Sequence, residues 1–160
     1  MKVGLLSYRS HPYSGGQGIY IRHLSRSLKN LGHDVSVLSG PPYPELDAKV
    51  KLIKIPSLGM FESGKRFSAF QLRFLWSPVD LYEWITVMTG GFPEPYTYGK
   101  RVLKRLREPD IDFEVLLDNQ SLSSSLLEIQ RLYALAVTIH HPITKDHDLE
   151  MKNATTWQEK

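Results

Sequence analysis

Residues 2–39 read KVGLLSYRSHPYSGGQGIYIRHLSRSLKNLGHDVSVLS, and they carry the strongest indication of the fold. Its first part, residues 2–8, is a short apolar run of the kind that forms a buried strand. A glycine-rich loop follows, then residues 17–31 with apolar side chains at helical spacing, and then a second apolar run over residues 34–39. A strand, a glycine-rich loop, a helix and a strand in this order indicate parallel strands joined by a crossover helix.

The rest of the chain continues the alternation of strands and helices. Strands are predicted over residues 50–55, 113–117 and 134–139, and helices over residues 67–76, 79–89, 96–107 and 122–132. Residues 50–55 alternate apolar and basic side chains, which is typical of an edge strand with one wet face. The pattern therefore predicts an α/β fold: one domain with a Rossmann-like parallel sheet and helices on both faces, and a helical insert at about 56–109 that is rich in aromatic residues.

Length and composition exclude several classes of protein. The 160 residues suffice for one domain with its own core, and the absence of Cys excludes disulfides, thiol nucleophiles and thiolate metal sites. The apolar stretch near the N-terminus is too short for a secretory signal, and no apolar run is long enough to span a bilayer. The net charge of +3 lacks the concentrated basic stripe of a nucleic-acid-binding protein. We expect a cytoplasmic protein that binds no nucleic acid.

The loop Ser14-Gly15-Gly16-Gln17-Gly18 is the first candidate site. It opens a predicted helix, where the first backbone N–H groups have no partner within the helix and carry the positive end of its dipole. Glycine lets a ligand approach this backbone closely, so the loop predicts an anion site, usually for phosphate. The simpler alternative is a tight turn between strand and helix that binds nothing.

Two common phosphate-binding fingerprints are missing. The nicotinamide motif requires a third glycine three residues after Gly18, where Ile21 stands, and an acidic residue after the second strand, which ends in Ser39-Gly40. The nucleoside triphosphatase loop requires Gly-Lys followed by Ser or Thr, which occurs nowhere in the chain. A dehydrogenase and a P-loop enzyme are therefore both disfavoured.

Polar residues that follow two other predicted strands are the second set of candidates. His140 ends a strand, and an imidazole there can donate hydrogen bonds to hydroxyls or act as acid or base. His141 next to it is more simply a turn residue. Asn119 and Gln120 can bond a sugar or a base, or can merely close the strand before the next helix. A metal site built from His140, His141, Asp146, His147 and Asp148 matches no specific pattern, so we expect no metal.

A basic helix is predicted around residues 96–107, with apolar residues interleaved. Such a helix can dock on anionic lipid, although a solvated face is the commoner explanation. If it docks, the protein would be peripheral on the inner face of the membrane. The basic residues that would make this contact are Lys100, Arg101, Lys104 and Arg105.

Two segments of the sequence resemble a known family. The stretch SGGQGIYIRHLSRSLKNLGHDVSVLS is similar to the opening of the retaining glycosyltransferases of family 4, which have the GT-B fold: a Gly-Gly loop, an Arg-His-Leu helix segment and a Gly-His-x-Val strand. The segment AVTIHHP is similar to the family strand that ends in Thr-x-His before the acceptor cleft. Together the two matches bracket residues 20–140. Residues 56–109 match no motif of the family, in the region where such enzymes vary with acceptor.

The resemblance implies roles for particular residues. Gly15 and Gly16 would lie against the donor diphosphate or the acceptor phosphate, with Gln17 beside them, and His140 would reach the hydroxyls of the donor sugar. Asn119, Gln120 and His141 are further candidates for acceptor or sugar contacts. The substrates would be a nucleotide-sugar and an acceptor, with no cofactor. No metal is needed either, because basic residues and helix dipoles can neutralise the leaving diphosphate.

One departure from the family limits what this chain can do alone. The second GT-B domain holds most of the nucleotide and carries two glutamates eight positions apart, and no such pair occurs here. We therefore expect an N-terminal, acceptor-side domain that is inactive without a C-terminal nucleotide-sugar domain or a separate subunit that supplies it. The alternatives are a non-catalytic interaction module and, less favoured, another two-domain phosphate-binding enzyme such as a nucleotide-sugar epimerase.

Overall fold

The fold is a parallel sheet covered by helices on both faces. The computed structural model of the chain describes residues 1–13, 16–59 and 72–140. The strands are β1 (Lys2–Ser7), β2 (Asp34–Ser39), β3 (Lys51–Lys54), β4 (Val115–Asn119) and β5 (Ala134–Thr138). They form one sheet in the order β3-β2-β1-β4-β5, and every neighbouring pair is parallel. The predicted α/β, Rossmann-like single domain is confirmed.

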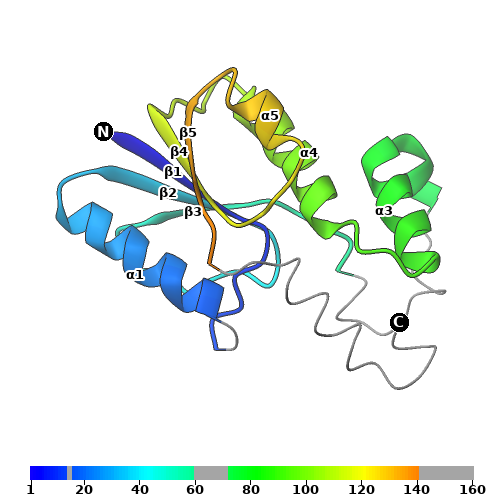
Figure 1. Ribbon diagram of the computed structural model, residues 1–160, viewed down its shortest axis with the longest axis horizontal. Helices are drawn as coiled ribbons and strands as arrows, with labels where there is room; N and C mark the ends of the chain where they lie inside the picture. The colour runs from blue at the N-terminus through cyan, green and yellow to red at the C-terminus, as the bar shows by residue number, and fades with distance from the viewer. Residues whose placement is uncertain (14–15, 60–71, 141–160) are drawn as a thin grey trace.

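Helix α1 (Gly16–Asn30) covers one face of this sheet, and α4 (Glu94–Leu106) and α5 (Leu126–Ile129) cover the other (Figure 1). Successive side chains of a strand point to opposite faces, so a central strand needs apolar residues on both. In β1, Leu5 packs toward α1 and Leu6 packs toward α4, and both are fully buried. This double burial is the physical reason why residues 2–8 form a continuous apolar run.

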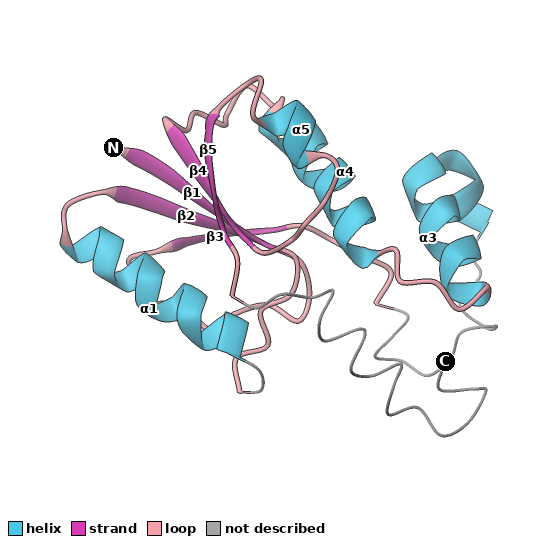
Figure 2. Cartoon of the chain, viewed as in Figure 1, coloured by secondary structure: helices cyan, strands magenta, loops and turns pink. Residues whose placement is uncertain are grey.

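The remaining helices stand beside α4 rather than on the sheet. A 3-10 helix, η1 (Leu72–Trp76), leads into α3 (Pro78–Met88), which packs against η1 and α4 (Figure 2). Ser77 caps α3 by accepting a hydrogen bond from the Asp80 N–H, and Pro78 occupies the first turn, where its missing N–H costs nothing. The predicted insert at 56–109 therefore contains both α3 and the crossover helix α4.

Several predicted boundaries differ from the structure. β4 runs over residues 115–119 instead of 113–117, because its pairing with β1 begins at Val3 and Phe113 packs into the core instead. The predicted helix 122–132 is reduced to the four residues of α5, because Leu122 has a positive φ of 49° and the helix begins only after Ser125. The helix predicted over 67–76 is a 3-10 helix over residues 72–76, and its first part lies outside the described residues.

The edge strand was predicted correctly. β3 lies at one end of the sheet, with Ile53 buried and both lysines exposed. The opposite edge is β5, whose side chains are exposed or half-buried throughout. β1 and β4 are neighbours in the middle of the sheet, although the described residues between them form two strands, three α-helices and the 3-10 helix η1.

Candidate functional site

The predicted site segments converge where the strand order reverses. From β1 the chain proceeds outward to β2 and β3, and then returns to β4 and β5 on the other side of β1. Ligands of open parallel sheets bind beyond the carboxyl ends of the strands at such a switch point. The glycine-rich loop follows β1, Asn119 ends β4, and His140 follows β5, so all three candidate segments lie at this edge.

The glycines of the loop differ in how tightly the surrounding structure packs against them. Gly18 is buried, and a Cβ at this position would lie 2.1 Å from the carbonyl oxygen of His11, so the start of α1 can pack against the loop only through glycine. Gly16 is exposed, and a Cβ there would meet nothing within 4 Å. Packing therefore explains Gly18 and leaves Gly16, at the first turn of α1, without a structural reason. Gly15 lies outside the described residues.

His140 is held by three contacts. Its ring Nε2 lies 2.6 Å from Oδ1 of Asn119, and its backbone N–H donates to Oε1 of Gln120 at 2.9 Å. Its ring also meets the ring of Tyr20 edge to face, with centroids 4.7 Å apart. Tyr20 belongs to α1, the helix that the glycine loop opens. The segment that follows β5 is therefore in direct contact with this helix.

The turn after β4 is locked by a buried carboxylate. Asp118 is fully buried, and it accepts hydrogen bonds from the backbone N–H and the hydroxyl of Ser121. Burial raises the pKa of Asp118 above its ordinary value of 3.8, and the bonds from Ser121 oppose this rise. The locked turn holds Gln120 at a φ of 52°, which is uncommon for a residue other than glycine.

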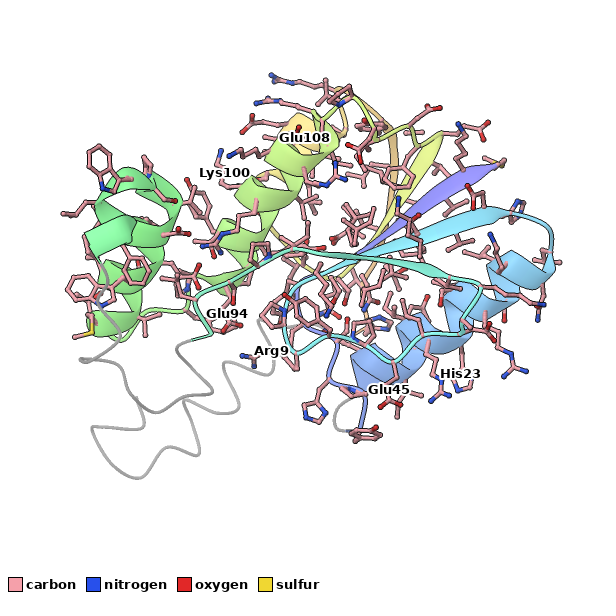
Figure 3. All side chains as sticks on the ribbon, turned by 180° about the vertical axis from the view of Figure 1, so that it is seen from behind. Arg9, His23, Glu45, Glu94, Lys100 and Glu108 are labelled. Atoms are coloured by element: carbon pink, nitrogen blue, oxygen red, sulfur yellow. The ribbon has the colours of Figure 1, made fainter. Side chains whose placement is uncertain are left out.

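Arg9 and Tyr20 belong to the site but were not predicted as functional. Arg9 lies two residues after the end of β1, and its guanidinium forms a 3.0 Å ion pair with Glu94 at the start of α4 (Figure 3). Its Nε is buried and has no hydrogen-bond partner within residues 1–13, 16–59 and 72–140. The signal in the sequence is a charged residue at the carboxyl end of the central strand. Tyr20 offers no comparable signal, since its position on the helix reads as an ordinary apolar one.

Other predicted candidates are not placed. His141 lies outside the described residues, and so do the remaining residues of the metal cluster considered above, Asp146, His147 and Asp148. Within residues 1–13, 16–59 and 72–140, no group of three or more His, Asp or Glu side chains is arranged to hold a metal ion. Gln17 is half-buried in the first turn of α1, beside Gly16.

A cavity of about 550 Å³ lies between α3, α4 and the end of β3. Trp76 lines it with 89% of its surface exposed, and Arg101 and Lys104 contribute from α4. Trp76 belongs to the insert at about 56–109 that the sequence predicts to be rich in aromatic residues. Other aromatic residues of that segment serve packing instead: Tyr98 is buried in the core, and Tyr82 stacks edge to face on Tyr96.

The basic residues of α4 are largely paired with carboxylates. Lys100 bonds to Glu128 at 2.9 Å, Arg101 to Asp80 and Glu83, and Arg105 to Asp110. These pairs reduce the charge that a membrane would meet, and Lys104 is the member of the set with no ion pair in the part described. Docking on anionic lipid stays a prediction. No helix among the described residues has the length and apolar content needed to cross a bilayer.

The order of strands, the helices on both faces and the glycine-rich turn after the central strand define a Rossmann-like α/β domain. The chain matches no model of a known protein family. It is 46% identical over 160 residues to the MMP alpha-(1->4)-mannosyltransferase of Mycolicibacterium hassiacum. The match covers 99% of this chain and 39% of that relative.

This relative confirms the resemblance of the sequence to glycosyltransferases. An identity of 46% across nearly the whole chain means that the two segments share one fold and one ancestry. The chain spans about two fifths of the length of the relative that it matches, so the relative contains a further, larger part.

Proposed function

We propose that this chain forms the acceptor-side half of a retaining glycosyltransferase of family 4, which transfers mannose from a nucleotide-sugar to an acceptor. The observation that carries the proposal is the 46% identity to a mannosyltransferase over 99% of the chain. An α-linked product, as in the name of that relative, formed from an α-linked sugar nucleotide corresponds to retention at the anomeric carbon. The other half of the site, which binds the nucleotide, would come from a second domain.

The glycine loop would bind the phosphate side of the substrates. The first N–H groups of α1 carry the positive end of a helix of 15 residues, which favours a negatively charged phosphate oxygen. Gly16 and Gln17 stand at this point, Gly15 precedes them in the sequence, and the open space above Gly16 leaves room for close approach. As negative charge develops on the leaving diphosphate, these fixed dipoles would stabilise it without reorganising.

His140 would contact the hydroxyls of the donor sugar. His140 is exposed although three contacts hold it, so its ring can present an edge to a ligand in a fixed orientation. A hydrogen bond that strengthens in the transition state raises kcat more than it lowers KM. The neighbouring Asn119 and Gln120 would act through His140, because Asn119 bonds to its ring and Gln120 accepts its backbone N–H.

A chimeric enzyme tests this proposal. The matching segment of the Mycolicibacterium hassiacum relative is replaced by this chain, and the purified chimera is incubated with nucleotide-activated mannose and a mannoside acceptor. We expect mannosyl transfer by the chimera with retention, seen as an α-anomer by NMR, and none by the 160-residue chain alone. His140→Ala should lower kcat/KM of the chimera by roughly 10- to 100-fold.

The controls separate misfolding from loss of chemistry. His23→Ala changes an exposed histidine of α1 away from the switch point and should leave transfer unchanged. If the chimera folds but neither hydrolyses the nucleotide-sugar nor transfers mannose, the proposed activity is refuted. Ordinary turnover by the 160-residue chain alone would refute the proposal that it supplies only half of the site.

A further inference from the structure

Asn119 and His140 meet because of the register of the last two strands. Asn119 pairs with Thr138, and His140 lies two residues beyond Thr138, on the same side of the sheet. Leu117, two residues before Asn119, packs into the core beneath α1, so this side is the α1 face. The contact of His140 with Tyr20 of α1 agrees with that placement.

The hydrogen bond between the two side chains fixes which ring nitrogen carries the proton. The Asn119 atom in the bond is Oδ1, a carbonyl oxygen that only accepts. The neutral His140 ring must therefore donate through Nε2–H, and its Nδ1 carries the free lone pair. Within the described part of the chain Nδ1 has no hydrogen-bond partner, and the residue is exposed. Nδ1 is thus the ring atom that is left to accept a hydrogen bond.

This arrangement costs stability. Among the residues that the structure describes, the Nδ2 of Asn119 is buried without a hydrogen-bond partner, although an unpaired buried donor is unfavourable. Gln120, which accepts the backbone N–H of His140, has a positive φ, and so does Leu122. Strain of this kind persists where the surrounding structure imposes it, and it clusters at functional sites. Packing alone would be served better by an apolar residue at position 119.

We propose that Asn119 is a positioning residue: it holds His140 in the Nε2–H form so that Nδ1 accepts a hydrogen bond from a substrate hydroxyl. The inference deepens the proposed function, because it assigns the atom of His140 that faces the sugar. Asn119 itself acts only through His140. Gln120 and Tyr20 fix the backbone and the ring plane, and Asn119 fixes the proton.

The test is NMR on the 160-residue chain with ¹⁵N-labelled histidine. The two nitrogen shifts report the tautomer of each neutral imidazole, and a His140→Gln variant identifies the signals of His140 among the six histidines. The variants are Asn119→Leu, which removes the acceptor at similar volume, and Asn119→Asp, which keeps an acceptor oxygen. Spectra are recorded at mildly alkaline pH, together with the melting temperature of each variant.

We expect only the Nε2–H form of His140 in the wild type, the appearance of the Nδ1–H form in Asn119→Leu, and a protonated Nε2 again in Asn119→Asp. The melting temperature of Asn119→Leu should be unchanged or raised, since the orphan donor is gone. An Nδ1–H form in the wild type overturns the proposal. An unchanged tautomer in Asn119→Leu with a lowered melting temperature also overturns it, because that is the behaviour of a structural residue.

Kinetics on the chimeric enzyme complete the test. Asn119→Leu should lower kcat by roughly 10- to 100-fold with little change in KM, and Asn119→Asp should recover part of the loss. Equal losses in both variants would count against positioning. An inactive chimera would refute the proposed function while the NMR result still decides the role of Asn119, so the two failures are distinguishable.

Discussion

Arg101 of α4 ties this helix to α3, and removing its charge should destabilise the domain strongly. Its guanidinium bonds to Asp80 and to Glu83, whose side chain is only 2% exposed. Glu83 also accepts the backbone N–H of Leu58 at 3.0 Å, which fixes the carboxylate in place. Breaking a buried ion pair leaves an uncompensated charge that cannot reach water, so Arg101→Ala should cost about 3–5 kcal/mol of unfolding free energy.

The assay is urea unfolding followed by tryptophan fluorescence. With a slope of about 2 kcal/mol per molar of urea, the loss corresponds to a midpoint lowered by roughly 1.5–2.5 M. Arg105→Ala is the matched control on the same helix: its partner Asp110 is 59% exposed, so the midpoint should hardly change. The double variant Arg101→Leu/Glu83→Leu should recover part of the loss, because the buried carboxylate is removed together with its partner, while Asp80 still lacks its cation and the Leu58 N–H its acceptor. Equal midpoints for Arg101→Ala and Arg105→Ala would refute this reasoning.

Three further predictions concern the switch point. Tyr98→Phe should cost about 2–4 kcal/mol in the same urea assay, because the buried hydroxyl donates to a backbone carbonyl of β2 at 2.7 Å and accepts a backbone N–H of β1 at 2.8 Å; a neutral result would contradict it. Because burial raises the pKa of Asp118, the folded state holds its proton more tightly than the unfolded one, and stability from this group falls as pH rises above 3.8. Asp118→Asn should therefore flatten this part of the curve of melting temperature against pH, whereas an unaltered slope would show that other groups cause it. Gly18→Ala should lower the free energy of unfolding by about 1–3 kcal/mol, because its Cβ would lie 2.1 Å from His11 O. Gly16→Ala should raise the free energy of unfolding by about 0.5–1 kcal/mol. Urea midpoints that shift in the same direction for both variants would refute this distinction.

The sequence predicted the fold because its strongest signals are local and periodic. The runs at residues 2–8 and 34–39 are largely apolar, which predicts strands that are buried on both faces. Residues 50–55 alternate apolar and basic side chains, which predicts a strand that is buried on one face. The boundaries that failed depend on distant partners. β4 begins at Val115 because β1 pairs there, and α5 is short because the Asp118 turn imposes a positive φ on the residues before it.

The candidate site was predicted as three separate segments. Nothing in the spacing of residues 16–18, 119–120 and 140 indicates that they touch, since that depends on the order β1-β4-β5. The contact between Tyr20 and His140, and the bond between Asn119 and His140, require the register of two strands and the position of a helix. The glycines that open the first helix and the polar residues at the strand ends could be predicted from the sequence, but their contacts could not.

The two edges of the sheet are protected unequally. β3 presents Lys51 and Lys54 to solvent, and charged lysines on an edge strand discourage pairing with another chain. β5 carries no lysine, and Val137 is 44% and Ile139 66% exposed. Of the two edges of the sheet, β5 is therefore the one without charged side chains that discourage pairing with a further strand, and it is also the edge that leads to His140.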